Sequence, residues 1–522
     1  MNQQYHQPFA AGMFFILMAS LPGVLNAAGP SATNDFNVRA FGAAGDGKTL
    51  DSEAINKAID AAAQSGGGTV TVPQGTYLCG SIHLKSNINL LIDAGATILG
   101  APQEMKAYDP AEPFPGHAYQ DGGHTHFHNS LIWGENLTNV TVSGRGTIKG
   151  GGLVTEVPLF DRLNGIPKTE ESAPSANEMR IGNKAICLKL CRNVIIHDVT
   201  IAHGGHFAIL ATGCDNLTVD NVTIDTDRDG MDIDCCRNTI ISNCRVNSPN
   251  DDGICPKSTY ALGEARVTEN LTIVNCQVSG FPEGALLNGP MLTGTGRRGT
   301  GRIKFGTESS GGFRNCTVSN CTFRSCHGLA LEEVDGGVLE DITISNITMV
   351  DIADYAIYIT TGKRNRTPNL TTKSRARNIL ISDIIIDGVS KMSGIQIMGL
   401  PEQPIEGVRL DNIRLISEGG ATAADATIVP KELGVHYPEA GNLGTLPAYG
   451  VYARHLHGLE LENINVSFRT KDLRPAASFS DVQGLDIDNF KPQLSEGVPG
   501  AVFAPDVHDL VIRDSPALQA PK

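Results

Sequence analysis

The sequence predicts an all-β fold, a right-handed parallel β-helix, from a short internal repeat and from a composition suited to strands and turns. The repeat has the form V/I-x-Asn-V/C/I-x-V/F/I, followed by a glycine- or aspartate-rich turn and another short apolar run. Its asparagines are Asn221, Asn243, Asn275, Asn320 and Asn346, with later copies at Asn412 and Asn463. The 58 glycines and only 19% charged residues are typical of short strands joined by frequent turns.

The length of the repeat explains why its copies must stack. The interval from Asn221 to Asn243 is 22 residues, and a unit of two or three short strands cannot bury its apolar face alone. Like positions of neighbouring coils then lie about 4.8 Å apart, so the asparagines are expected to form a side-chain ladder. Leucine-rich repeats, the rival solenoid, would need a leucine spacing that these coils lack.

The predicted organisation is a signal peptide over residues 1–28 and a single β-helix domain over residues 29–522, with the N-terminal cap and first coils in residues 29–110. Residues 9–28 form an apolar stretch closed by small residues, which predicts a secreted or periplasmic protein; an uncleaved anchor is the alternative. No other window is apolar enough to span a membrane in the mature chain. Ser52 to Gln64 has helical periodicity, with Ser52 as the expected N-cap, and should cover the open end of the solenoid.

Charge and cysteine placement narrow the function. A net charge of -15 excludes nucleic acid as a partner, because phosphate binding needs a broad basic surface. Cys244, Cys276 and Cys321 each follow a repeat asparagine, so they are expected to stack as small apolar core residues rather than to form a disulfide framework. A disulfide through Cys235 or Cys236 stays open.

A column of acids is the strongest indication of chemistry. Counting eight residues from Asn221, Asn243 and Asn275 gives Asp229, Asp251 and Glu283. Asp252 directly follows Asp251. Carboxylates stacked one strand apart repel each other and raise at least one pKa, which suits acid/base work or a bound metal. A calcium site and a plain ladder of turn aspartates are the competing interpretations.

Basic residues gather close to this column in the sequence. A glycine-rich segment contains four basic residues within a span of eight: Arg297, Arg298, Arg302 and Lys304. A flexible loop that places cations beside an acid cluster is suited to capture a substrate carboxylate. A solvated basic loop is the alternative.

The segments DTDRDGMDID and NSPNDDGICPKS resemble glycoside hydrolase family 28, the polygalacturonase family. Its usual signature is Asn-Thr-Asp-Gly-x-Asp, then Asp-Asp one coil later, Gly-His-Gly and Arg-Ile-Lys. The run from Asp227 to Asp232 is similar to the first motif, Asp251-Asp252 to the second and Arg302-Ile303-Lys304 to the last. The opening DGKTLDSEAINKAID and the segment VSGRGTIKG are similar too, so the resemblance covers residues 36–359 and implies a pectin-lyase-like solenoid.

Two departures from the family bear on the substrate. No Gly-His-Gly occurs, and by counting the histidine position falls on Glu283. Rhamnogalacturonan hydrolases of the same family similarly have a glutamate near that position. The Arg-Ile-Lys tripeptide comes one coil early, and the next coil instead contains His327 to Glu332.

The resemblance implies a hydrolase of acidic, galacturonate-containing polysaccharide that works by single-step inversion, with Asp251 as the acid and with Asp229 and Asp252 activating water. It implies no cofactor and no metal. A rhamnogalacturonan hydrolase is one alternative, and a calcium-dependent pectate lyase and a non-catalytic carbohydrate-binding β-helix are others. The expected catalytic residues are Asp229, Asp251, Asp252 and Glu283, and the expected substrate-binding residues are Arg302, Lys304, Arg298, Lys257, His327, Glu332 and Tyr355. Tyr355, Tyr358 and the segment 437–452 are expected either to wall the cleft or to pack in the core.

Overall fold

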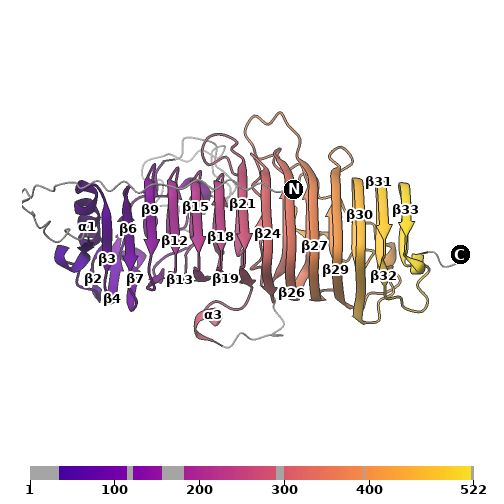
Figure 1. Cartoon of the computed structure of the whole chain (residues 1–522), viewed down its shortest axis with the longest axis horizontal. Helices are drawn as coiled ribbons and strands as arrows, with labels where there is room; N and C mark the ends of the chain where they lie inside the picture. Colours follow the sequence, from indigo (N-terminus) through magenta and orange to yellow (C-terminus); the bar gives the residue numbers. More distant parts are fainter. Residues whose placement is uncertain (1–34, 114–121, 156–180, 290–298, 392–393, 519–522) are drawn as a thin grey trace, which may run out of the picture. The chain divides into compact units, whose positions relative to one another are not determined.

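A computed structural model of the chain describes residues 35–113, 122–155, 181–289, 299–391 and 394–518. The predicted signal peptide and Arg298 lie outside these residues. From Asp35 onward the strands form a right-handed parallel β-helix, and Figure 1 shows them lying side by side along this unit. The predicted fold class is therefore confirmed.

Each early coil contributes one strand to each of three parallel sheets. The first sheet contains β1 (Asp35–Asn37), β3 (Gly68–Val72), β6 (Ile88–Ile92), β9 (Thr138–Ser143), β12 (Arg192–His197), β15 (Asp215–Asp220), β18 (Arg237–Ser242) and β21 (Thr268–Val274). The second contains β2 (Asp46–Leu50), β4 (Gly75–Cys79), β7 (Ala96–Gly100), β10 (Thr147–Lys149), β13 (Thr200–Ala202), β16 (Thr223–Asp225), β19 (Arg245–Asn247) and β22 (Gln277–Ser279). The third contains β5 (Ile82–His83), β8 (Ile132–Glu135), β11 (Lys184–Lys189), β14 (Phe207–Thr212), β17 (Asp229–Asp234) and β20 (Ile254–Lys257).

The third sheet continues past β20 through a bridge between Ile254 and Ile303. It then runs through β23 (Lys304–Phe305), β25 (His327–Glu333), the end of β26 (Val338–Thr361), β28 (Ile395–Met398) and the start of β30 (Val451–Thr470). The other strands of this half are β24 (Phe313–Arg324), β27 (Arg375–Val389), β29 (Ile405–Gly419), β31 (Ala477–Asp488), β32 (Lys491–Pro492) and β33 (Val502–Arg513). Several of these strands bend through a corner and so serve two sheets.

The core is built from ladders of aliphatic residues. One runs through the first sheet in register: Ile196, Val219, Ile241, Ile273, Val318, Ile344, Ile381, Leu410, Leu461 and Ile487. All of these side chains are buried. Branched side chains at one inward position stabilise the stack because each covers the apolar surface of the next.

The asparagine ladder is also present. Each of the seven repeat asparagines has a positive φ, such as 58° at Asn243, a backbone conformation that asparagine tolerates better than most residues. Asn275 Nδ2 donates to Asn243 Oδ1 at 3.3 Å. A second ladder, which the sequence reasoning missed, joins Asn139, Asn193, Asn216, Asn238, Asn270 and Asn315.

The twelve cysteines, all among the described residues, are buried and unpaired. Register places Cys244, Cys276 and Cys321 above one another, as predicted, and Cys235 and Cys236 form no disulfide. Their thiols therefore act as small apolar core groups.

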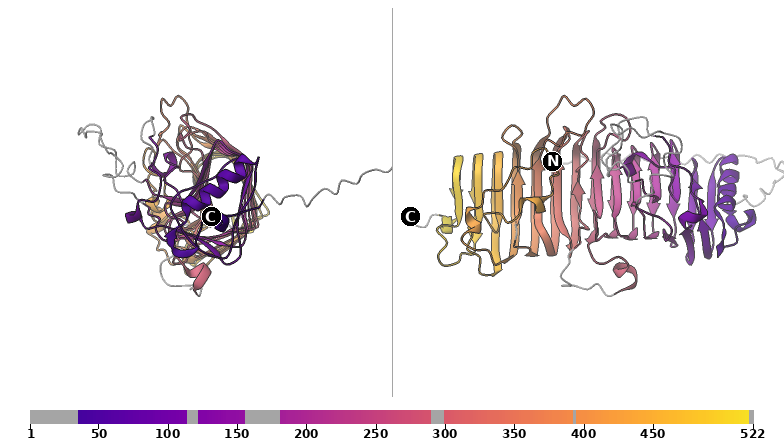
Figure 2. Two further views of the ribbon diagram at one scale, coloured as in Figure 1. Left: turned by 90° about the vertical axis from the view of Figure 1, so that its left-hand side faces the viewer. Right: turned by 180° about the vertical axis from the view of Figure 1, so that it is seen from behind.

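Helix α1 (Ser52–Gln64) lies across the N-terminal end of the coils, as Figure 2 shows. It buries Ile55, Ala58 and Ile59 against them, so the predicted capping helix is confirmed. The N-cap prediction is wrong by one residue: Asp51 occupies that position, and its carboxylate accepts hydrogen bonds from the backbone of residues 44 and 45. The other helical segments are short: α3 (Ala285–Asn288), η1 (Val38–Phe41), η2 (Gln103–Met105), η3 (Gly122–Thr125), η5 (Asp425–Thr427), η6 (Ala440–Leu443) and η7 (Pro516–Leu518).

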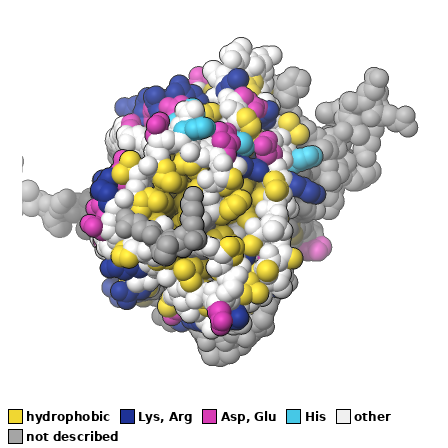
Figure 3. All heavy atoms as spheres, turned by 90° about the vertical axis from the view of Figure 1, so that its right-hand side faces the viewer, with side chains coloured by type: hydrophobic (Ala, Val, Ile, Leu, Met, Phe, Trp, Pro, Cys, Tyr) yellow, Lys and Arg dark blue, Asp and Glu magenta, His cyan; other side chains and the backbone are white. Residues whose placement is uncertain are grey.

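The opposite end of the solenoid is apolar. Figure 3 shows hydrophobic side chains gathered in the middle of this face, and Phe503, Leu510 and Val511 of the last strand, β33, are exposed. Among the described helices, none is both long and apolar enough to cross a membrane.

Candidate active site

The three predicted aspartates converge on the third sheet, but in a register that counting did not give. Asp225 pairs with Asn247, whereas Met231 pairs with Ile254. The coil that contains Asp251 and Asp252 therefore has one residue more between these two positions than the coil that contains Asp229. Asp229 therefore lies in register with Asp252, and the prediction that it stacks on Asp251 is wrong. This one-residue shift depends on the length of the turn between the second and the third sheet, which the spacing of the repeat asparagines does not reveal.

Asp229 and Asp252 are both buried, and their nearest carboxylate oxygens lie within 4.8 Å of each other. Burial, reinforced by the charges of Asp251 and Asp232, raises the pKa of Asp229 well above its ordinary value. Burial also opposes ionisation of Asp252, but the positive charges of Arg302, Lys304 and Lys257 outweigh it and lower that pKa. The pKa values of these two buried carboxyls are thus shifted in opposite directions, a separation typical of acid/base sites.

Asp251 differs from both because 30% of its side chain is exposed. Arg228 Nη2 donates to Asp251 Oδ2 at 2.5 Å and lies 3.4 Å from Asp229 Oδ2. The same guanidinium approaches His206 Nε2 at 3.5 Å. Arg228 therefore links the exposed carboxylate to the buried pair, from a position where the family motif has threonine.

Arg302 and Lys304 belong to the coil that directly follows the aspartate pair. Ile303 bridges Ile254, so these two cations lie in the coil stacked on that of Asp252. Arg302 Nε donates to Asp252 Oδ1 at 2.7 Å, and Lys304 Nζ lies 3.3 Å from Asp252 Oδ2. Each residue is only 2% exposed, so the prediction of an exposed basic loop is wrong for these two cations.

The structure adds Tyr437 and Glu439 from the segment 437–452, for which the sequence predicted either a cleft wall or core packing but no contact with a buried cation. Glu439 lies in the segment 420–450, which connects β29 to β30, and its two oxygens accept from Arg302 Nη1 at 2.9 Å and Nη2 at 3.1 Å. The Tyr437 hydroxyl lies 3.3 Å from Lys304 Nζ. Burial opposes the charge of Glu439, but Arg302 lowers its pKa to about 2. No repeat motif runs through this segment, so counting along the chain could not place it over the site.

Glu283 does not join the carboxylate group. It lies just before α3, in the excursion that leaves the coil, and its Oε1 is 2.8 Å from His203 Nδ1. Burial raises the pKa of Glu283 even though His203 opposes the shift. The predicted third position of the column is therefore wrong, because the chain leaves the solenoid before reaching it.

Most of the other predicted contact residues are buried. Lys257 pairs with Glu308 at 3.0 Å and lies 3.8 Å from Asp232. Tyr355 is fully buried, and its hydroxyl accepts a hydrogen bond from Arg302 Nη1. Tyr358 is also fully buried, so core packing rather than stacking on a sugar describes both tyrosines.

His327 is the predicted contact residue that stays partly open. Its Nε2 lies 3.7 Å from Asp354 Oδ2 and its Nδ1 lies 3.8 Å from Glu439 Oε1. Burial, together with the nearby charge of Arg302, lowers its pKa. A neutral imidazole between two carboxylates can donate to or accept from a sugar hydroxyl.

Glu332 gives a testable dependence of stability on pH. It is fully buried, and burial raises its pKa to about 7 although Lys304 lies 3.9 Å away. The folded protein therefore binds this proton more tightly than the unfolded chain does, so the free energy of unfolding should fall as pH rises from about 4.5 to about 7 and then level off. Glu332→Gln should remove a loss on the order of 3 kcal/mol over that window, measured by denaturant unfolding at several pH values. Identical pH curves for the two proteins would contradict this assignment.

Among the residues that the structure describes, two groups of side chains have donor atoms close enough together to hold a metal ion: Asp229, Asp252 and Cys255, and His327, Asp354 and Glu439. In the first group burial raises the pKa of the Cys255 thiol well above its ordinary value, and a protonated thiol is a poor ligand. Asp252 is also already neutralised by two buried cations. The first group is therefore better suited to acid/base chemistry than to metal binding.

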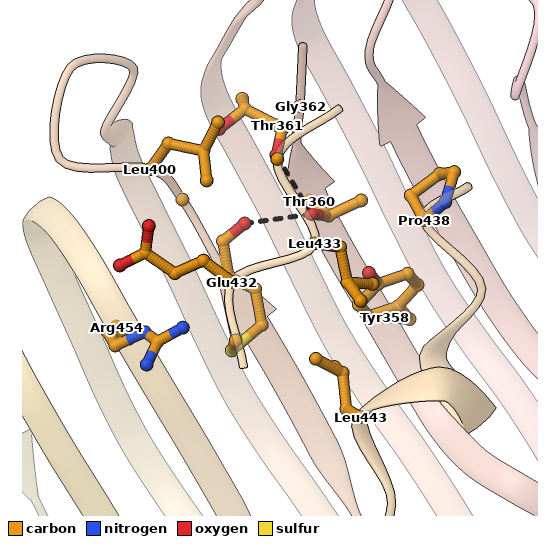
Figure 4. A pocket seen from close by; sticks show the side chains of 13 residues that line it. Tyr358, Thr360, Thr361, Gly362, Leu400, Glu432, Leu433, Pro438, Leu443 and Arg454 are labelled. Carbon is orange, nitrogen blue, oxygen red and sulfur yellow. Dashed lines mark hydrogen bonds between the residues drawn. The ribbon is translucent and has the colours of Figure 1, made fainter. Parts of the chain in front are cut away.

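A pocket of about 300 Å³ lies farther along the third sheet, beneath the segment 420–450. Figure 4 shows Tyr358, Glu432 and Arg454 around it, with Thr360 Oγ1 donating to the carbonyl of Met398 at 2.9 Å. Arg454 Nη1 donates to the carbonyl of residue 430, while its Nε and Nη2 have no hydrogen-bond partner among the described residues. Spare donors on a buried guanidinium favour water or an anion here.

Comparisons with known proteins agree with this fold. A family model described as rhamnogalacturonase A/epimerase, pectate lyase-like, matches residues 36–281. A probable polygalacturonase of Vitis vinifera is 28% identical over 246 residues, which is 45% of this chain and 47% of that protein. The exo-poly-α-D-galacturonosidase of Dickeya chrysanthemi is 27% identical over 253 residues, 42% of this chain and 41% of that protein. Plasmin and fibronectin-binding protein A of Streptococcus pneumoniae is 36% identical over 189 residues, 35% of this chain and 23% of that protein.

The aligned regions thus span less than half of each of these relatives. Among solved structures, the family 28 exopolygalacturonase of Yersinia enterocolitica superposes with a TM-score of 0.62 at 18% identity, covering 88% of this chain and 79% of that one. At this identity the likeness supports the fold. The family-model match and the polygalacturonase relatives show that the chain is similar to the polygalacturonases, glycoside hydrolase family 28, over its N-terminal half.

Proposed function

We propose that this protein hydrolyses glycosidic bonds of a galacturonate-containing, pectic polysaccharide. The observation that best supports this function is the aspartate group, in which the partly exposed Asp251 lies beside the buried Asp229 and Asp252, with Asp252 kept ionised by neighbouring cations. Hydrolysis of a glycosidic bond needs one carboxyl that donates a proton and one carboxylate that activates water. The polygalacturonase relatives support the same substrate class.

The different exposure of the three aspartates suggests a catalytic role for each. Asp251 reaches the surface, so we assign it the proton that goes to the glycosidic oxygen. Asp252, held ionised by Arg302 and Lys304, accepts the proton of the attacking water, and Asp229 orients that water. The separation within 4.8 Å brings Asp229 and Asp252 to one water, whereas an inverting acid and base stand about 6.5–9.5 Å apart.

Arg228 is assigned the contact with a substrate carboxylate. Among the described cations of this site it is the most exposed, with 15% of its side chain open, whereas Arg302 and Lys304 are buried behind their own partners. A guanidinium binds a carboxylate through two parallel hydrogen bonds. Substrate binding would also draw Arg228 away from Asp251, which must carry a proton to act as the acid.

The experiment that tests the function is product analysis. The protein would be incubated with homogalacturonan and with rhamnogalacturonan, and new reducing ends and unsaturated products would be measured. We expect saturated products with new reducing ends. Unsaturated products would assign a lyase instead. Binding without any product would assign a non-catalytic role, for which the match to a protein named for binding plasmin and fibronectin is the supporting observation.

Chelation separates the hydrolase from a calcium-dependent enzyme. Because two buried cations already neutralise Asp252, treatment with a chelator should leave turnover unchanged. The measurement is the rate of reducing-end release before and after chelation, with calcium added back as the control. Activity that disappears with the chelator and returns with calcium would replace this proposal with a metal-dependent mechanism.

A further inference from the structure

Arg302 and Lys304 have no unused charge for a substrate. The Nε of Arg302 donates a hydrogen bond to Asp252 at 2.7 Å, and its two Nη atoms donate to Glu439 at 2.9 and 3.1 Å. The ammonium of Lys304 lies 3.3 Å from Asp252, 3.9 Å from Glu332 and 3.3 Å from the Tyr437 hydroxyl. Three carboxyl groups of the protein thus surround two cations.

The surface above these cations is lined by acceptors. Glu439 and Asp354 have about a quarter of their side chains exposed, 25% and 28%, and His327 lies between them. A sugar with its own carboxylate would place another negative charge beside Glu439 and Asp354, and like charges brought together cost binding free energy. The hydroxyl groups of an uncharged sugar can instead donate hydrogen bonds to the same oxygens.

We propose that Glu439 is a specificity-determining residue. Its carboxylate pairs with both Nη atoms of Arg302, and the sugar site beside Glu439 and Asp354 therefore selects an uncharged sugar. This assignment rests on the proposed hydrolase function. The uncharged sugar is either a neutral residue that alternates with galacturonate or a galacturonate whose carboxyl is esterified. On the other side of Asp251, Arg228 meets the acidic sugar, so the two sides of the site differ in the charge they accept.

The test measures kcat and KM of the full chain on three substrates: unesterified homogalacturonan, methyl-esterified homogalacturonan and the rhamnogalacturonan backbone. For the wild-type protein, kcat/KM should be about tenfold or more higher on a substrate that offers an uncharged sugar than on unesterified homogalacturonan. Comparing methyl-esterified homogalacturonan with the rhamnogalacturonan backbone then shows whether that sugar is an esterified galacturonate or a neutral residue. Glu439→Gln keeps the shape but removes the charge. It should shift the ratio of kcat/KM toward unesterified homogalacturonan by about tenfold, chiefly through a lower KM.

Two further variants make the result specific to this charge. Glu439→Asp keeps the carboxylate and should keep the wild-type preference, even if its shorter side chain weakens the pair with Arg302. Glu432→Gln is the matched control on the same segment, because Glu432 pairs with His455 at 3.1 Å and not with Arg302. It should leave the substrate ratio unchanged. Thermal unfolding of each variant would verify that the fold is retained.

A wild-type preference for unesterified homogalacturonan, with the same ratio in Glu439→Gln, would overturn the assignment. Calorimetric affinities for the matched unesterified and esterified oligosaccharides give a readout that does not depend on turnover. If no substrate is hydrolysed, the proposed hydrolase function fails, while tighter binding of the esterified oligosaccharide, weakened in Glu439→Gln, would still support the role of Glu439. Tighter binding of the unesterified oligosaccharide by both proteins would refute it.

Discussion

Replacing Asp251 with asparagine is expected to lower kcat on the hydrolysed pectic substrate by about 10²–10⁴-fold, because an amide cannot supply the proton that the leaving oxygen needs. The change should leave the fold intact, since Asp251 is partly exposed and its carboxylate accepts hydrogen bonds from the flexible side chain of Arg228 and from the backbone N–H of Asp252, which an asparagine oxygen can also accept. The measurement is the rate of reducing-end release, with thermal unfolding of both proteins in parallel.

Asp227→Asn is the matched control for this experiment. Asp227 lies in the same turn region as Arg228 and Asp229, and its Oδ1 accepts a hydrogen bond from Asn250 rather than joining the buried pair. It should retain activity within a few-fold of wild type. Comparable rates for Asp251→Asn and wild type would remove Asp251 from the mechanism.

Arg302→Met is expected to have the largest effect on stability. The substitution leaves Asp252 without its shortest ion pair and Glu439 without its two hydrogen bonds, in a place where Arg302 is 2% exposed. Breaking a buried pair by removing one partner costs about 3–5 kcal/mol, because the remaining charge stays buried without compensation. Denaturant unfolding would measure this loss, and activity should fall with it because Asp252 loses the nearest of the cations that keep it ionised.

An exposed arginine provides the control for that loss. Arg375 lies 3.5 Å from Glu406, and both side chains are about half exposed, 50% and 43%. Arg375→Met should change the free energy of unfolding by less than about 1 kcal/mol, because water screens such a pair. Equal losses for Arg302→Met and Arg375→Met would mean that the buried network contributes little to stability.

The buried ion pairs around the site form a continuous chain. Beyond Lys257 and Glu308, Arg364 lies 3.3 Å from Glu308 and also hydrogen-bonds Asp335. Charges at these positions are costly unless each is paired. They therefore define one arrangement of the third sheet on which the aspartates depend, and of these residues only Lys257 lies in a motif segment that resembles the family.

The sequence by itself determined the β-helix, the capping helix and the placement of Asp229, Asp251 and Asp252 on adjacent coils. These features could be predicted because each depends on residues within one coil, such as Asn243 with Cys244, or on a motif as short as Asp251-Asp252. Repetition then supplies the long-range contacts, since every coil stacks on another of the same pattern. The aliphatic and asparagine ladders follow from that repetition.

Only the tertiary structure decided how the site is assembled. One extra residue in a turn set Asp252, and not Asp251, in register with Asp229, and an excursion removed Glu283 from the column. Glu439 reaches Arg302 from 137 residues away, in a segment without a repeat. Local patterns do not encode turn lengths or the path of such a segment, because both are determined by packing and charge pairing between distant parts of the chain.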